Sequence, residues 1–125
     1  VFGRVVRTVG DITTTSTTLV DVTGATVTLI TKASPCRYSA VQSTYRSVGT
    51  AGSIRFNVDV DGVLLHGTDG LVIDTAVTNE ALNGSFSGQT AALTAASHTI
   101  KEQWLTTTGT ATLAANTSNN HMWAV

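Results

Sequence analysis

The chain has 125 residues, of which only 12% are charged, and its seven Lys and Arg against eight Asp and Glu leave a net charge of −1. This length predicts a single domain, residues 1–125, and the charge excludes a protein that binds nucleic acid through a basic face. Since 42% of the residues are hydrophobic and no run of about 18 apolar residues occurs, neither a disordered acidic tail nor a membrane-spanning helix is expected.

The first half of the chain alternates in the manner of β-strands. Thr and Ser make up about a quarter of the residues, and Val is common. β-Branched side chains of this kind favour a pleated strand over a helix. Strands are predicted at residues 4–9 and 19–22, where the second is ended by Thr23 and Gly24. A third, at 25–31, alternates Ala, Val and Leu with Thr and Ile, which indicates one buried face.

The clearest predicted unit is a hairpin over residues 53–65. Ile54, Phe56, Val58 and Val60 alternate with the polar residues at 55, 57 and 59. Asp61 and Gly62 follow between two apolar runs, and this pair suits the two central positions of a type I′ turn, which need positive φ. The apolar face of the hairpin is expected to be core.

Further strands are predicted at residues 36–48, 71–77, 85–90, 98–106, 110–114 and 121–125. Ile100 and Trp104 are expected on the buried face of the strand at 98–106. Short strands at near-regular spacing, without a long helical crossover, predict an all-β antiparallel jelly-roll sandwich of about 8–10 strands. An immunoglobulin-like sandwich has a similar length, but its typical Cys…Trp…Cys core is absent.

No arrangement of residues in the sequence indicates catalysis, a cofactor or a metal. Asp59, Asp61 and Gly62 resemble the start of a calcium loop, but its remaining ligands are missing and the hairpin accounts for the same residues. The three His have no ligand partner at metal-binding spacing. A single Cys, Cys36, is expected to be a buried apolar residue. We therefore expect a protein that is not an enzyme.

Three stretches resemble small β-domains of tailed-phage structural proteins. They are residues 15–24 (TSTTLVDVTG), 58–62 (VDVDG) and 96–104 (ASHTIKEQW). Such domains are similar to the trimeric jelly roll of tumour necrosis factor and the complement globular heads. The chain departs from that pattern at Glu102, where the family usually has an apolar residue. A carboxylate there implies a sheet edge, a subunit interface with a partner cation, or a strand register shifted by one residue.

The resemblance implies a homotrimeric capsid decoration or cement protein of the virion. The alternative is the receptor-binding tip of a tail fibre, with a carbohydrate or protein ligand. No shaft-like or linker segment is visible, which favours a small protein complete in itself.

The expected partners are further copies of the chain and the major capsid protein or another virion protein, with no nucleic acid or membrane. Phe2, Arg4, Val5 and Arg7 are the candidate contacts to the capsid, because this segment combines apolar and cationic side chains. An ordinary edge strand is the alternative reading of the same segment. Glu102 and Trp123 are the candidate residues of a subunit interface.

Overall fold

The computed structural model describes residues 2–6, 10–46, 52–74, 81–114 and 121–124, with the backbone alone for residues 45, 46, 73, 74, 81, 82 and 121–123. These residues form eleven strands and no helix. The strands are β1 (Gly3–Val6), β2 (Ile12–Thr14), β3 (Val20–Ile30), β4 (Pro35–Arg46), β5 (Ile54–Val60), β6 (Val63–Leu64), β7 (Leu71–Asp74), β8 (Ala81–Ala92), β9 (Ser97–Thr106), β10 (Ala111–Leu113) and β11 (His121–Ala124).

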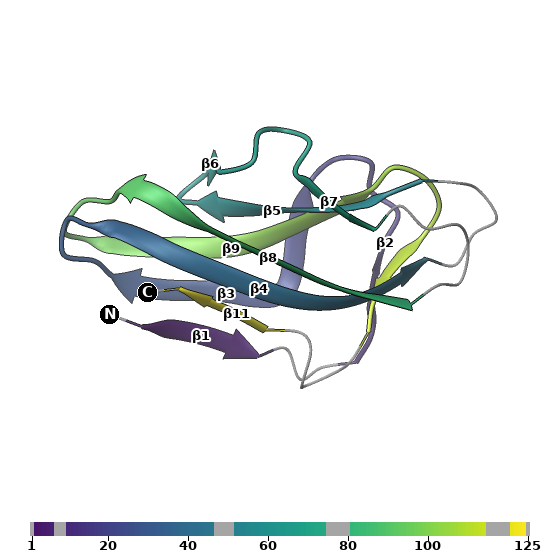
Figure 1. Ribbon diagram of the computed structural model, residues 1–125, viewed down its shortest axis with the longest axis horizontal. Helices are drawn as coiled ribbons and strands as arrows, with labels where there is room; N and C mark the ends of the chain where they lie inside the picture. The colour runs from purple at the N-terminus through teal and green to yellow at the C-terminus, as the bar shows by residue number, and fades with distance from the viewer. Residues whose placement is uncertain (1, 7–9, 47–51, 75–80, 115–120, 125) are drawn as a thin grey trace.

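The strands pair into two antiparallel sheets that face each other as a sandwich (Figure 1). In the six-stranded sheet, β8 lies along one edge of β4, while β11 and β10 follow one another along the other edge. β1 pairs with β11 and β2 with β10. The five-stranded sheet has the order β3-β9-β5, with β6 and β7 beyond β5. This confirms the predicted antiparallel jelly-roll sandwich.

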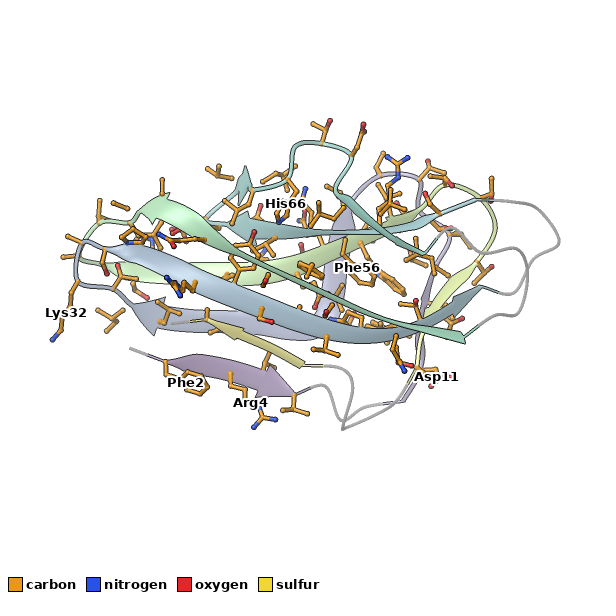
Figure 2. The ribbon with its side chains drawn as sticks, viewed as in Figure 1. Phe2, Arg4, Asp11, Lys32, Phe56 and His66 are labelled. Atoms are coloured by element: carbon orange, nitrogen blue, oxygen red, sulfur yellow. The ribbon has the colours of Figure 1, made fainter. Side chains whose placement is uncertain are left out.

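The core lies between the sheets and contains every residue that the alternation assigned to it. Phe56, at the centre, is fully buried, and its ring is stacked 5.9 Å from Phe86 of the opposite sheet and 6.1 Å from Trp104 (Figure 2). The other predicted core residues, Ile54, Val58, Val60 and Ile100, are also buried. Cys36 is buried too, as expected.

The turn of the β5–β6 hairpin has the predicted geometry. Asp61 and Gly62 have φ of 52° and 90°, the positive values that a type I′ turn requires. Asp59 Oδ1 accepts a hydrogen bond of 2.9 Å from the Gly62 N–H, which closes the turn from the strand side.

One expectation about strand limits was wrong, and one strand face is more buried than alternation alone indicates. Gly24 does not separate two strands: β3 is continuous, and the register with β9 shifts between Asp21 and Thr26, so Gly24, at φ 81°, lies in a bulge. Asn57 and Asp59 lie on the strand face opposite the core cluster, as their alternation predicts, yet both are buried. The loop after β6 covers Asn57, whose amide donates to Gly67 O at 2.6 Å and whose Oδ1 accepts the His66 N–H at 3.0 Å.

We predict that Phe56→Ala lowers the free energy of unfolding by about 3–5 kcal/mol, because it removes the middle ring of a close-packed stack and leaves a cavity. Urea denaturation followed by intrinsic fluorescence measures this loss. The control is Val63→Ala, because Val63 is 64% exposed and a surface substitution of this kind changes stability by about 0.5 kcal/mol or less. A loss below about 1 kcal/mol for Phe56→Ala would contradict this account of the core.

Candidate functional site

Phe2, which precedes strand β1, and Arg4 within it are two of the predicted contact residues that lie exposed to solvent. Phe2 is 65% exposed and Arg4 is exposed, and both lie along the outer edge of the molecule (Figure 2). Val5 points the other way and packs against the core. Arg7 lies outside the described residues. The segment is therefore an edge strand that also offers one aromatic and one cationic side chain.

Phe2 borders a shallow groove of about 500 Å³ between the start of β1 and the end of β3. The lining residues are Phe2, Thr28, Leu29, Ile30, Lys32 and Ser97. Ile30 is as exposed as Phe2, at 65%, so two large apolar side chains lie at the surface beside the Lys32 ammonium. The close fit of β1 on β3 depends on Gly3, where a Cβ atom would collide with Val27 Cγ1.

The outer face of the six-stranded sheet is neutral along the centre of β4 and β8. The outward side chains described there are small or apolar and carry no charge: Ser39, Val41, Ser43, Asn83, Ser85 and Ser87. Ser39 and Val41 are half-buried. Such a face can be covered by another protein surface without burying an unpaired charge.

The outer face of the five-stranded sheet differs because the charges described at its centre are paired with one another. Asp21 of β3 accepts hydrogen bonds from Gln103 at 2.8 Å and from Lys101 at 3.0 Å. The Gln103 hydrogen bond, followed by that of Lys101, lowers the pKa of Asp21, and the same Asp21 contact raises the pKa of Lys101. These partly exposed groups stay hydrated, so the network contributes modestly to stability.

Glu102 is fully buried between the sheets, in phase with Ile100 and Trp104. The register of β9 is therefore the predicted one, and the carboxyl group lies inside the subunit instead of at a sheet edge or on an outer surface. Gln42 Nε2, from β4 of the opposite sheet, donates to both Glu102 oxygens at 2.5 Å. Gln42 Oε1 is buried and has no hydrogen-bond partner among the described residues.

Trp123, the other candidate interface residue, lies on β11 directly opposite Ser39 of β4. Its backbone therefore belongs to the six-stranded sheet, beside the neutral face. Its side chain lies outside the described part of the chain.

His98 and Asp61 join β9 to the β5–β6 turn. His98 Nδ1 lies 2.6 Å from Asp61 Oδ2, and the Thr99 N–H donates to Asp61 Oδ1 at 2.8 Å. The Asp61 hydrogen bond and that of the Thr94 carbonyl raise the pKa of His98. In turn, the hydrogen bonds of Thr99 and His98 lower the pKa of Asp61. The sequence offered no signal for this pair, because the two residues are 37 positions apart.

His66, in the loop after β6, contacts residues of both sheets. Its Nε2 lies 2.6 Å from the Tyr38 hydroxyl, and its ring meets those of Tyr38 and Phe86 edge to face. Burial lowers the pKa of His66 and raises that of Tyr38. The neutral imidazole can thus accept the Tyr38 hydrogen bond. This pair holds the loop after β6 against the core.

Neither His pair belongs to a metal centre in the described residues, where no three His, Cys, Asp or Glu side chains gather closely enough to hold an ion. The described part of the chain also contains no helix capable of spanning a lipid bilayer. The neutral sheet face and the groove beside Phe2 are two surfaces that a partner can contact.

The fold is similar to several solved structures at low sequence identity. Eiger TNF from S. frugiperda has a TM-score of 0.59 and 9% identity, and the match covers 100% of this chain and 90% of that one. The structure of infectious bursal disease virus, Gx strain, has a TM-score of 0.57 and 8% identity, over 98% of this chain and 34% of that one. Dimeric latent PorU from Porphyromonas gingivalis reaches 0.50 at 10% identity, over 98% and 12%.

No protein-family model matches the chain, and no curated protein sequence matches it significantly. At identities this low, structural likeness shows the fold alone. The chain is thus a TNF-like jelly-roll β-sandwich of a kind that also occurs in a virus. The comparisons identify no particular phage family.

The two histidine pairs predict opposite effects of pH on stability. The raised pKa of His98 means that its stabilising contribution is complete below about 6.5, the pKa of an unfolded His, and is lost as pH rises through its folded pKa. The lowered pKa of His66 means that stability is lost as pH falls below about 6.5 toward its folded pKa. We therefore expect His98→Asn to flatten the alkaline side of the stability profile and His66→Phe to flatten the acid side.

Melting temperatures between about pH 5 and pH 8.5 test this, since histidine titrates across that range. Each variant serves as the control for the other, because the rest of the titrating groups are the same. A profile that changes on the same side in both variants would contradict the assignment.

Proposed function

We propose that this chain is a non-enzymatic structural protein of a virion, a homotrimeric unit that decorates or cements a capsid. The observation that carries the proposal is the contrast between the two outer sheet faces. On the five-stranded sheet, the described charges at the centre of the face are paired with each other. On the six-stranded sheet, the centre of β4 and β8 carries no charge, and Ser39 and Val41 there are half-buried. The TNF-like fold and the likeness to a viral structure support the same interpretation.

Self-association through the neutral face follows from its chemistry. Interface cores exclude charge, and closed symmetry uses the same patch on every subunit. Val41 lies in the middle of this face, on β4, and its neighbours across the strand pair are Ser85 on β8 and the backbone of His121 on β11. A second copy of the chain can cover these residues without burying an unpaired charge.

Docking to the capsid is proposed for the edge formed by β1. Phe2 and Ile30 are the two most exposed large apolar side chains that the structure describes. Arg4 and Lys32 add positive charge beside them (Figure 2). The partner that fits this edge is a segment of a capsid protein that carries an apolar side chain next to a carboxylate.

Light scattering should give a trimeric mass for the purified chain. Val41→Glu should shift the protein to the monomer, because it places an unpaired charge in the interface, and circular dichroism should remain that of a folded β-protein. The matched control is Thr28→Glu, which adds the same charge at an exposed position of β3. A monomer at high micromolar concentration for the wild-type chain, or equal dissociation of both variants, counts against the proposal.

The docking role predicts that Phe2→Ala combined with Arg4→Ala lowers the occupancy of purified capsids while trimers stay intact. Both side chains are exposed, so their removal spares the core contact of Val5. Val63→Ala, an exposed apolar residue on the other sheet, is the control. Undiminished occupancy in the double variant would reject this edge as the anchor.

A further inference from the structure

The outer face of the six-stranded sheet also holds a shallow recess of about 440 Å³, where β4 begins and β8 ends. Its lining residues are Arg37, Tyr38, Ser39, Ser87, Gly88 and Gln89. Arg37 lies directly opposite Gln89 in the strand register, and Ser39 lies opposite Ser87. Alternation places these four side chains on the outer face, at the corners of one rectangle.

The four outward side chains are not engaged in polar contacts within the described part of the chain. In the described part of the chain, none of these four side chains forms a hydrogen bond or an ion pair, and Arg37 and Gln89 are exposed. The cations on the other sheet differ. Arg55 contacts Ser53 and Asp69, and Lys101 contacts Asp21. A guanidinium, an amide and two hydroxyls therefore converge on one recess with their hydrogen-bonding capacity available.

Two local features of the backbone shape the recess. The register between β4 and β8 shifts between Pro35 and Arg37, a bulge of the kind that re-aims a side chain next to binding sites. Gly88 lies opposite Tyr38, and a Cβ atom there would collide with the Tyr38 hydroxyl. The Tyr38 ring therefore covers Gly88 on the inner face, so the floor of the recess is closed toward the core.

We propose that this recess binds a sugar that carries a carboxylate, such as a uronic acid. The planar guanidinium of Arg37 matches a carboxylate with two parallel hydrogen bonds. The Gln89 amide and the hydroxyls of Ser39 and Ser87 can each donate and accept, which suits the hydroxyl groups of a sugar ring. Arg37 is the one cation in the recess, so a singly charged carboxylate fits the site better than a phosphate of higher charge.

The inference does not rest on the proposed function. The recess shares Ser39 and Ser87 with the border of the neutral face, but Arg37 and Gln89 lie nearer the end of the strands and are exposed. A site at that end would let a capsid-bound or fibre-borne unit recognise an acidic glycan.

The experiment is a titration of the wild-type chain, followed by calorimetry or ligand-observed NMR, with glucuronic acid, its neutral methyl ester, acetate and inorganic phosphate. The test variants are Arg37→Gln and Ser87→Ala. The matched control is Arg4→Gln, which removes the same charge from another exposed position of the same sheet.

We expect saturable millimolar binding of glucuronic acid, at least about tenfold weaker binding of the ester, and the same loss in Arg37→Gln, because each removes the charge-assisted pair. Ser87→Ala should weaken glucuronic acid but not acetate, and Arg4→Gln should leave both unchanged. Absence of glucuronic acid binding, equal binding of the ester, equal loss in Arg4→Gln, or binding of acetate or phosphate as strong as that of glucuronic acid would each overturn the proposal.

Light scattering of Arg37→Gln separates this result from the proposed function. If the chain forms trimers but binds no acidic sugar, the recess proposal is rejected and the trimer proposal stands. If the chain is monomeric but binds glucuronic acid, the trimer proposal is rejected and the recess proposal stands.

Discussion

The two sheets of this small sandwich pack against each other around the ring of Phe56. It stacks on Phe86 from the six-stranded sheet and on Trp104 from its own sheet. Phe86 lies opposite Ala40 on β4, so this aromatic contact lies on the inner face of the β4–β8 strand pair. The neutral face and the Arg37 recess are made by that strand pair. Their geometry therefore depends on an aromatic contact on the reverse side of the sheet.

The buried Gln42 and Glu102 add specificity to this packing. A carboxyl group between two sheets costs desolvation, and an apolar pair of the same volume is often as stable. What the pair provides is a constraint on alignment. Slipping either β4 or β9 by one residue would turn one partner outward and leave the other buried without its hydrogen bond, so the native register is favoured over its neighbours.

Much of this fold was predictable because alternation acts locally. The core residues from Ile54 to Val60, the Asp61–Gly62 turn and the register of Ile100 and Trp104 all follow from side chains that alternate across one strand. Asn57 was not predictable, because the loop that buries it comes ten residues later and returns over the strand.

The candidate sites were less accessible to sequence reasoning. The exposure of Phe2 and Arg4 agrees with the expectation for an edge strand. Glu102 looked like a surface or interface residue because a carboxyl group rarely lies in a core, and its amide partner is 60 positions away. The Arg37 recess exists only once β4 has paired with β8 across about 50 residues in the given register. The sequence pattern of neither β4 nor β8 alone predicts the recess.

The pairing of β1 with β11 has a consequence for how the protein is made. β1 precedes the other described strands along the chain, but its only sheet neighbour among them is β11, which follows all the others. The edge of β1 therefore stays unpaired during translation until β11 has also been synthesised. Strand pairs this distant along the chain form late and slowly, and unpaired edges are prone to wrong partners in the meantime. The exposed Arg4 on β1 opposes such wrong pairing, because a charge on an edge strand disfavours association with the strand of another nascent chain.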